Sequence, residues 1–406
     1  MARRVAVIGA GAAGTMAAIF AAASGAETLL LERTRDGGRK ILISGGGRCN
    51  VLPARVDETR FVTDSSPNTM RKMVRSWPLA EQVAFFEETL GIPLVEEADS
   101  VKIFPASHRA RDVRDGLLAY AARQGATLHT DTYVTDLEPT GTGWRIARGA
   151  GAPLDVDSVV VATGGLSVPN TGSDGTGLRV LERLGHTVHP TYAALTPLTA
   201  EPAPFGSLSG VSLRVTLTAR CEARAATASG GFLFTHRGYS GPSVLDVSHV
   251  PVRSRGASVP ARVTVRWTVA EDAEVEAHLR AQGSRTVLGA LRSLVPDRLA
   301  HLLIEQAGVE PTRSLAELSR TDRRRLLDVL LRGELPWSGD EGYKKAEVTG
   351  GGVSLAEIDP GTMESRRHAG LFLCGEVLDA FGPIGGYNFL WAWATGRSAG
   401  RAAAKS

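Results

Sequence analysis

The sequence predicts an α/β fold in which a parallel sheet with packed helices is interrupted by an inserted unit of strands and helices. Three observations predict it. A β-branched run, a glycine-rich turn, an alanine-rich segment and a second apolar run follow one another within the first 32 of 406 residues. Two more apolar runs that end in glycine, 158–165 and 370–376, lie far along the chain. Between them, from about residue 190, alternating strand patterns give way to helical ones.

The first 32 residues contain the most specific pattern. Val5–Ile8 is typical of a buried parallel strand, and the turn 9–14 follows it directly. Thr15–Ser24 predicts a helix that ends at Gly25, and 27–32 predicts a second strand that ends on an acid. A glycine motif alone is weak evidence, because such turns are common. Strand, glycines, helix, strand and acid in this order favour a site over a purely structural turn.

The residue types in this pattern suit a Rossmann-like dinucleotide site. Gly9 allows the tight turn, Gly11 lets the backbone approach a pyrophosphate, and Gly14 lets helix and strand pack closely. The helix N terminus offers N–H groups and a positive dipole end to the phosphates. Glu32 lies 18 residues beyond Gly14, near the spacing expected for a carboxylate that binds ribose hydroxyls.

The segment after Glu32 favours FAD over NAD. An NAD-binding fold usually continues directly into another βα unit, whereas this chain enters the loop Ser44–Asn50, which contains three consecutive glycines. Such a loop is a poor helix or strand, and its N–H groups can lie against a flat or anionic ligand. A flexible surface turn is the alternative.

Two distant segments support the same cofactor. The strand 158–161 leads into Ala162–Gly165, where small residues let the chain pass close to a ligand. The strand 370–373 leads to Glu376, and 385–388 precedes a helix expected over Phe389–Ala404. A carboxylate at a strand end suits ribityl hydroxyls, and a helix N terminus suits the electron-rich edge of a reduced flavin. A simple helix cap or surface acid is the alternative for Glu376.

These motifs together resemble the BaiN-like (YhiN-like) flavoprotein family, whose relatives include aminoacetone oxidase. The resemblance spans nearly the whole chain and rests on Arg39–Ile41, Ser44–Asn50, Lys102–Pro105, Ala162–Gly165, Phe234–Pro242, Glu347–Val353, Cys374–Asp379 and Gly382–Asn388. It implies an FAD domain of the two-dinucleotide-binding type, interrupted by an inserted domain, and an FAD-dependent oxidoreductase. It leaves the substrate open, because members are linked to bile-acid double-bond reduction and to amine oxidation.

The resemblance also places Glu32, Lys40, Asn50, Glu376 and Asn388 at the flavin. With the motifs above, the expected cofactor contacts are Gly9, Gly11, Ala13, Gly14, Glu32, Arg33, Arg39, Lys40, Gly46, Asn50, Val134, Thr163, Gly164, Gly375, Glu376, Asp379, Asn388 and Phe389. The domains are expected at 1–190 and 341–406 for the FAD-binding part and at 191–340 for the inserted β-plus-helical part.

Candidates for the chemistry outside the cofactor motifs are weaker. His236 precedes a turn in which Gly241 or Ser240 can cap a helix that begins with Pro242. It is a candidate acid, Cys49 a candidate redox thiol and Tyr387 a candidate proton donor, but a turn histidine and a small packing cysteine are the simpler interpretations. The three cysteines are far apart and form no CxxC pair, so no metal site is expected and a reducing cytoplasm suits the chain.

The remaining features of the sequence limit the kinds of partner that we expect. The uncharged stretch 5–26 resembles a targeting segment, but its glycines favour the turn-and-helix interpretation, and no membrane association is expected. Net charge is only +3, and the arginines at 320–325 are interleaved with Asp322, so a solvated helix face is favoured over nucleic-acid binding. The expected partner is a small-molecule substrate, and oligomeric state stays open.

Three functions follow as hypotheses. The first is an oxidoreductase in which NAD(P)H transiently reduces the flavin and a conjugated small molecule accepts the hydride. The second is an oxidase of a small amine that releases hydrogen peroxide, which the presence of only one GxGxxG motif favours slightly. The third is a non-catalytic or RNA-associated flavoprotein, suggested by the arginine cluster.

Overall fold

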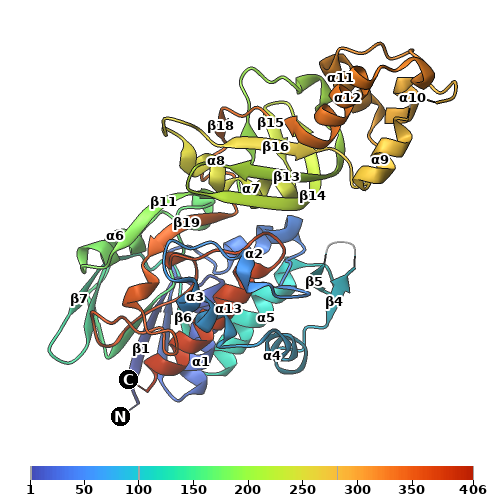
Figure 1. Cartoon of the computed structure of the whole chain (residues 1–406). Coiled ribbons are helices and arrows are strands. Elements are labelled where there is room, and N and C mark those ends of the chain that lie inside the picture. The colour runs from blue at the N-terminus through green and yellow to red at the C-terminus, as the bar shows by residue number, and fades with distance from the viewer. Residues whose placement is uncertain (1, 99–100, 281, 406) are drawn as a thin grey trace. The chain divides into compact units, whose positions relative to one another are not determined.

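The computed structural model describes residues 2–98, 101–280 and 282–405 (Figure 1). The chain divides into two compact units, Met1–Ala193 with Glu347–Ser406 and the inserted Ala194–Ala346. The sequence suggested an insertion over 191–340. No described helix is both long enough and apolar enough to cross a membrane.

A five-stranded parallel sheet forms the centre of the first unit, in the order β20-β10-β1-β2-β6. Val7 of β1 pairs with Val160 of β10 on one side and with Leu30 of β2 on the other. The last four residues of β1 and all of β10 and β20 are buried, which explains their uninterrupted apolar sequences. The strands are β1 (Arg4–Ile8), β2 (Glu27–Leu31), β6 (Thr127–His129), β10 (Ser158–Val161) and β20 (Leu371–Leu373). The predicted α/β fold is confirmed.

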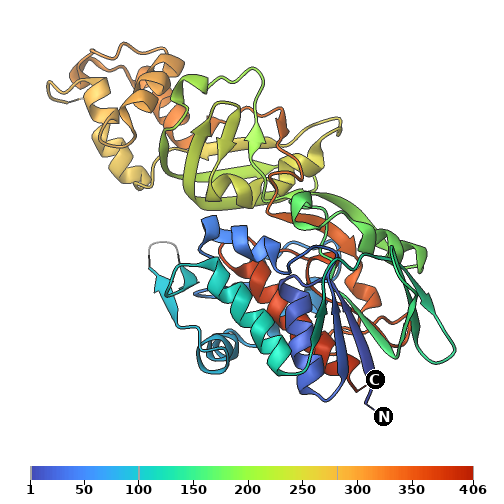
Figure 2. The ribbon, with the colours of Figure 1, turned by 180° about the vertical axis from the view of Figure 1, so that it is seen from behind.

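Three helices of this unit lie side by side: α1 (Ala12–Ala23), α5 (Ala110–Arg123) and α13 (Tyr387–Ala403) (Figure 2). The first and last helices approach closely, because a Cβ at Gly396 or Gly400 of α13 would collide with backbone carbonyls of α1. Both helices begin earlier than the sequence suggested, α1 at Ala12 and α13 at Tyr387. Helix α1 is therefore packed closely against α13, although the two helices are far apart in the sequence.

Short helices and small antiparallel sheets complete the first unit. The sheets have the orders β3-β5-β4, β7-β8-β9 and β11-β19, and the last pairs where the chain leaves and re-enters this unit. The helices are α2 (Arg39–Ile43), α3 (Pro67–Arg75), α4 (Leu79–Ala84) and α6 (Thr176–Arg183), and the strands are β3 (Leu52–Pro53), β4 (Leu94–Glu97), β5 (Lys102–Pro105), β7 (Val134–Pro139), β8 (Trp144–Arg148), β9 (Leu154–Val156), β11 (Val188–Ala194) and β19 (Val348–Val353).

The second unit is built on an antiparallel sheet in the order β17-β16-β13-β14-β15-β12-β18. Its longest strands alternate as expected: Val215, Leu217 and Ala219 of β13 are buried, whereas Thr216 and Thr218 are partly exposed. The strands are β12 (Leu198–Thr199), β13 (Ser212–Arg220), β14 (Ala225–Thr235), β15 (Gly238–Ser240), β16 (Arg262–Arg266), β17 (Gly333–Glu334) and β18 (Gly339–Asp340). The helices are α7 (Pro242–Val247), α8 (His249–Ser254), α9 (Asp272–His278), α10 (Val287–Leu291), α11 (Asp297–Ala307) and α12 (Arg320–Arg332). Gly241 caps α7 with Pro242 in its first turn, as predicted.

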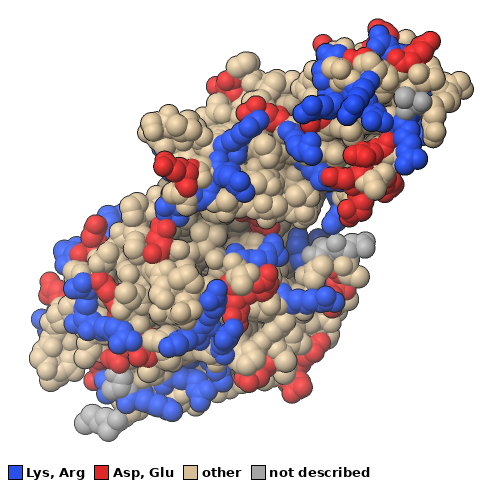
Figure 3. All heavy atoms as spheres, viewed as in Figure 1, with Lys and Arg blue, Asp and Glu red and all other residues tan. Residues whose placement is uncertain are grey.

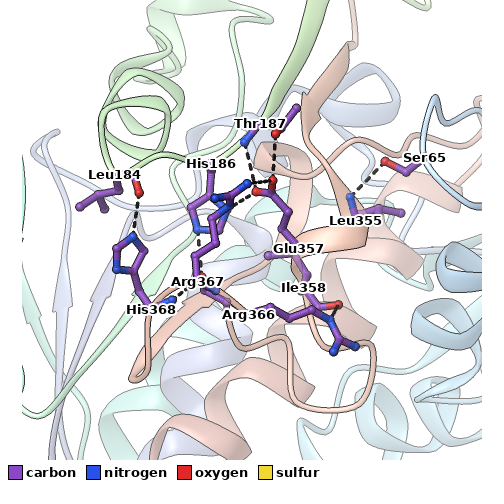
Figure 4. A network of polar contacts seen from close by, with 11 residues as sticks. Ser65, Leu184, His186, Thr187, Leu355, Glu357, Ile358, Arg366, Arg367 and His368 are labelled. Carbon is purple, nitrogen blue, oxygen red and sulfur yellow. Dashed lines mark hydrogen bonds and ion pairs between the residues drawn. The ribbon is translucent and has the colours of Figure 1, made fainter.

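A polar network in the first unit fixes the loop before β20 to the segment between α6 and β11 (Figure 4). The carboxylate of Glu357 accepts hydrogen bonds from His186 Nδ1 at 2.8 Å, from Arg367 at 2.6 Å, and from the backbone N–H and hydroxyl of Thr187. His186 Nε2 lies 3.0 Å from the Ser365 hydroxyl, so both imidazole nitrogens have partners. Burial alone raises the pKa of Glu357, but these hydrogen bonds outweigh it and lower the pKa to about 2. Burial lowers the pKa of His186, so its ring is neutral near pH 7.

We expect Glu357→Gln to lower the free energy of unfolding of this unit by about 2 kcal/mol at pH 7, because it removes charge-assisted hydrogen bonds. A depressed carboxyl pKa contributes stability above the unfolded-state value of 4.5, and that contribution is lost as the pH falls toward about 2. The difference between wild type and variant in urea unfolding should therefore shrink between pH 5 and pH 3. Asp155→Asn, at an exposed ion pair with Arg145, is the control and should change little. A pH-independent difference would contradict this account.

Candidate functional site

A cleft of about 380 Å³ lies where β1, β2 and β10 end, entirely within the first unit. Its lining includes Ile8 at the end of β1 with Gly9 after it, Glu32 after β2, and Thr163 after β10. Ligands of open α/β sheets bind at the carboxyl ends of the strands, and this volume is in the range of small-molecule sites. The parallel sheet therefore positions a ligand site at its carboxyl edge.

The glycine turn between β1 and α1 leaves open backbone at the cleft. A Cβ on Gly11 would meet no atom within 4 Å, whereas one on Gly14 would collide with the carbonyl oxygen of Gly9. Gly11 is the N-cap of α1, and no side chain caps this helix end. The first N–H groups of α1 are thus available to an anion, which fits the pyrophosphate of a dinucleotide.

The carboxylate of Glu32 is fixed at the edge of the cleft. One oxygen accepts a hydrogen bond from the Ala10 N–H at 2.9 Å, and the other accepts from the N–H and hydroxyl of Thr34 at 2.8 and 2.6 Å. Its side chain is buried, and the Ala10 contact joins it to the glycine turn. The oxygen that accepts from Ala10 keeps a further lone pair, so Glu32 can accept a hydrogen bond from a ribose hydroxyl.

An ion pair between two residues that are far apart in the sequence lies at another part of the cleft lining. Lys40 of α2 donates to Glu376, which follows β20, with Nζ and Oε2 2.6 Å apart, and also to the hydroxyl of Ser167 at 2.5 Å. The second oxygen of Glu376 accepts from the Ser167 hydroxyl at 2.6 Å and from the Thr349 N–H at 2.9 Å. The Glu376 side chain is 17% exposed, and these partners hydrogen-bond both of its oxygens. The network places an ammonium group in the cleft in a defined position.

The glycine loop after α2 is irregular, as expected. Gly45, Gly46 and Gly47 have φ values of 55, 68 and 84°, and Cys49 also has a positive φ of 59°. Ser44, Gly45, Gly46 and Asn50 line the cleft, and a Cβ on Gly46 would meet nothing within 4 Å. This stretch therefore presents bare backbone to a ligand.

Most of the predicted cofactor residues come together in this one cleft. Those that line it are Gly9, Gly11, Ala13, Glu32, Arg33, Arg39, Lys40, Gly46, Asn50, Val134, Thr163, Gly164, Gly375, Glu376, Asn388 and Phe389. The Thr163 hydroxyl is buried without a hydrogen-bond partner among the described residues, so it is available to a ligand. The Asn388 amide, in contrast, is engaged with both the N–H and the C=O of Gly382.

Gly14 and Asp379 lie outside the lining. Gly14 allows α1 to pack on the turn. Asp379, 2% exposed, accepts hydrogen bonds from the backbone N–H groups of Asp64 and Ser65 and from the Ser65 hydroxyl. Its burial raises its pKa. Asp379 thus fixes the chain at 63–65, and this geometry gives it no contact with the cleft.

None of the three candidates for the chemistry lines the cleft in the described structure. Cys49 is fully buried, and burial raises the pKa of its thiol to about 12, so the thiol is neutral. The hydroxyl of Tyr387 accepts from the Asp57 N–H and donates to the Arg55 carbonyl. His236 is exposed in the turn between β14 and β15 of the second unit.

Sequence reasoning missed Ser167 and Thr349. Both complete the Lys40–Glu376 network, and the Thr349 hydroxyl also accepts from the N–H groups of Leu166 and Ser167. Thr349 belongs to a motif that carried the family resemblance, which was the available signal. Ser167 follows Gly164-Gly165 without any recognisable pattern.

These features define a Rossmann-type FAD-binding protein. They are a parallel sheet, a glycine turn before an uncapped helix, a carboxylate placed for a ribose, and a cleft completed by the C-terminal segment. A family model described as "HI0933-like protein Rossmann domain" matches residues 3–402, and the chain belongs to this family. The resemblance seen in the motifs is thereby confirmed, and the chain is an FAD-dependent oxidoreductase.

Three curated relatives match over nearly their whole length. The chain is 31% identical to a "Ribosomal RNA dihydrouridine synthase" of Escherichia coli K12, over 96% of this chain and 95% of that protein. It is 33% identical to the protein of the same name from Haemophilus influenzae, with the same coverage. It is 32% identical to a "3-dehydro-bile acid delta(4,6)-reductase" of Clostridium scindens, over 99% of both chains.

Solved flavoenzymes share the fold at low identity. A 3-ketosteroid delta1-dehydrogenase from Sterolibacterium denitrificans has a TM-score of 0.52 at 13% identity, over 98% of this chain and 99% of that one. The open form of a flavocytochrome c3 fumarate reductase has a TM-score of 0.51 at 17% identity, over 99% and 78% of the two chains. These likenesses show the fold alone.

Proposed function

We propose that this flavoprotein reduces a carbon–carbon double bond conjugated to a carbonyl group, with NAD(P)H as the electron donor. NAD(P)H gives a hydride, the solvent gives a proton, and the two hydrogens saturate the double bond while NAD(P)⁺ is released. When bound, FAD supplies the two-electron chemistry that links donor and acceptor.

The similarity to relatives over nearly the full chain carries this proposal. The name of the Clostridium scindens relative describes reduction of double bonds in a 3-oxo bile acid. The names of the Escherichia coli and Haemophilus influenzae relatives describe formation of dihydrouridine in ribosomal RNA. Dihydrouridine is uridine in which the ring double bond conjugated to a carbonyl group is saturated. The substrates differ greatly in size, but the bond is of one chemical type. The reaction type is therefore better supported than the substrate.

The residues of the cleft suit a transient nicotinamide. The chain has one glycine fingerprint, and the cleft places it at the end of β1 beside Glu32. When FAD occupies that fingerprint, NAD(P)H has to bind at another place. The nicotinamide then dissociates either before or after the acceptor is reduced. Lys40 and the N terminus of α13 both contribute positive charge to the lining, which favours electron-rich states of a bound ligand.

We favour a small molecule as the substrate. Basic and acidic side chains are interspersed over the face seen in Figure 3. Asp322 of α12 pairs with Arg325 of the arginine cluster and with Arg313 before the helix, and Asp328 pairs with Arg332 at 3.0 Å, so part of the positive charge is neutralised locally. A face of this kind offers little net attraction for a polyanion.

Uridine in ribosomal RNA is the second candidate, because two relatives carry that name. One face of the second unit's sheet fits it: Arg214, Thr216, Thr218 and Arg220 alternate along β13, and the Thr216 hydroxyl lies 2.7 Å from that of Ser229 on β14. Neither Arg214 nor Arg220 forms an ion pair with another residue that the structure describes. Arginine and hydroxyl side chains are typical contacts to phosphate oxygens.

The test is an anaerobic titration of the FAD-loaded protein with NADPH and NADH, followed by addition of acceptors. Bleaching of the visible flavin bands by a nicotinamide is the expected first result. The reduced protein should then be reoxidised by a 3-oxo-Δ4 steroid, with the saturated product identified by mass spectrometry. Reoxidation by ribosomal RNA, with dihydrouridine in the digest, would transfer the proposal to the second candidate. An Arg214→Gln, Arg220→Gln double variant should then weaken RNA turnover and leave steroid turnover unchanged.

A flavin that stays oxidised with both nicotinamides would overturn the proposal. Hydrogen peroxide release on addition of a small amine, without nicotinamide, would identify the protein as an amine oxidase.

A further inference from the structure

The segment 164–176, here called the strap, forms one wall of the cofactor cleft. Gly164, Val168, Gly172, Asp174 and Thr176 of the strap all line the cleft. The strap follows β10 and ends in the first turn of α6. It therefore runs along the ligand site between two elements of regular structure.

One end of the strap is fixed inside the unit. The N–H groups of Leu166 and Ser167 donate to the Thr349 hydroxyl at 2.7 and 3.1 Å. The Ser167 hydroxyl donates to Glu376 and accepts from Lys40. These six polar groups are linked to one another, so this end stays in place while the neighbouring chain moves.

The other end of the strap is fixed by one arginine. Arg33 forms an ion pair with Asp174 at 2.6 Å and donates to the Gly172 carbonyl at 3.2 Å. The Arg33 guanidinium also lies 4.7 Å from the ring centroid of Tyr133, and the Tyr133 hydroxyl lies 3.0 Å from that of Thr176. Burial raises the pKa of Asp174, but hydrogen bonds from Arg33 and Thr176 outweigh it and hold the pKa below its usual value. The pair is therefore charged at neutral pH.

The two ends differ in exposure and in the strain between them. The Arg33 and Asp174 side chains are 36 and 37% exposed, against 29% for Lys40 and 17% for Glu376. Val168, a β-branched residue, has a φ of 49°, which is unfavourable unless contacts on both sides hold it. Opening at the Arg33–Asp174 end breaks the more exposed ion pair and releases the contacts on one side of Val168.

We propose that Arg33, Tyr133 and Asp174 form a latch over the adenosine end of the cleft, and that FAD enters and leaves by opening of the strap at this latch. The adenosine end is assigned because Arg33 directly follows Glu32, the carboxylate placed for the ribose. The latch retains the cofactor and takes no part in the reaction with substrate. The proposal of a latch therefore does not depend on whether the substrate is a small molecule or RNA.

Asp174→Asn tests the latch through the rate of FAD release. Holoprotein is diluted and ultrafiltered over time, and released FAD is measured in the filtrate by absorbance. We expect release to be roughly fivefold to thirtyfold faster than in wild type, since an exposed ion pair and a cation–π contact are weakened together. Raising NaCl from 50 to 500 mM should speed release from wild type and have little effect on the variant, because salt screens the pair that the variant lacks.

Glu97→Gln is the matched control. Arg48 and Glu97 form an ion pair of similar exposure at 2.9 Å, and Arg48 lies 4.4 Å from the Phe104 ring centroid, but none of the three residues lines the cleft. We expect Glu97→Gln to release FAD at the rate of wild type. Arg33→Gln separates the latch from a direct contact of Arg33 with FAD: in the latch, Arg33→Gln, Asp174→Asn and the double variant all release FAD at similar rates.

Unchanged release from Asp174→Asn, together with faster release from Arg33→Gln, would overturn the latch. Equal thermal unfolding of the FAD-free forms shows that a change in rate does not come from loss of the fold. Because the readout is FAD release, failure of the latch is distinct from failure of the proposed reaction.

Discussion

Gly11→Val is expected to abolish FAD binding while the protein stays folded. A Cβ at this position meets no protein atom within 4 Å, so we expect the fold to accept valine, whose side chain then fills the space in which the pyrophosphate approaches the N terminus of α1. We expect the Kd for FAD to rise at least about a hundredfold, since the phosphates lose backbone hydrogen bonds to charged groups worth about 1.5–3 kcal/mol each. Calorimetric titration of the FAD-free protein measures it, and circular dichroism checks the fold.

Two other glycines serve as controls for this result. Gly14→Val places its side chain against the Gly9 carbonyl and should reduce soluble, folded protein. Gly141 is exposed, and a Cβ there also meets nothing, so Gly141→Val should bind FAD like wild type. Normal FAD affinity of Gly11→Val would show that the pyrophosphate lies elsewhere.

Lys40→Met and Glu376→Gln are expected to shift the flavin midpoint potential in opposite directions. Lys40→Met removes a positive charge from the cleft and leaves the Glu376 carboxylate without its cation, which disfavours the electron-rich reduced cofactor. A charge-assisted hydrogen bond of about 1.5–3 kcal/mol corresponds to a potential lowered by roughly 30–65 mV. Glu376→Gln leaves the ammonium uncompensated and should raise the potential. Spectroelectrochemical titration of the FAD-loaded variants measures both shifts.

Potential shifts of opposite sign in the two variants distinguish an effect of charge on the flavin from a loss of structure in the network. A purely structural network would loosen FAD in both variants and move the potential in the same direction or not at all. Lys72→Met, on the exposed face of α3, is the control for loss of a lysine charge and should leave the potential unchanged. Equal shifts from Lys40→Met and Lys72→Met would contradict a specific role for the pair.

The parts of the structure that the sequence predicted are those specified over short stretches. The turn 9–14 is readable because each glycine has its own steric reason, and the strands of the parallel sheet are readable because burial on both faces requires uninterrupted apolar runs. The start of α1 was placed too late, at Thr15. The helix takes its first turn from Ala12 onward, inside the glycine motif, where alanine and glycine give no capping signal.

The parts that escaped prediction depend on distant segments meeting. Lys40 and Glu376 are 336 positions apart, and nothing local shows that they pair. Ser167, Thr349, Tyr133 and Asp174 act through partners on other elements, so their roles appear only once the sheet order is known. Conversely, Asp379 has the type and position of a ligand contact, and the fold uses it to hold the turn at 63–65.

The sheet that contains β1 and the helical layer that contains α1 both include elements from the part of the chain after the inserted unit. β20 pairs with β10 at one edge of the sheet, and α13 packs against α1. During translation the sheet and the helical layer can therefore be completed only after the inserted unit has been synthesised. It follows that the cleft stays open on one side of a growing chain until Gly375, Glu376 and Phe389, which help to line it, have been made.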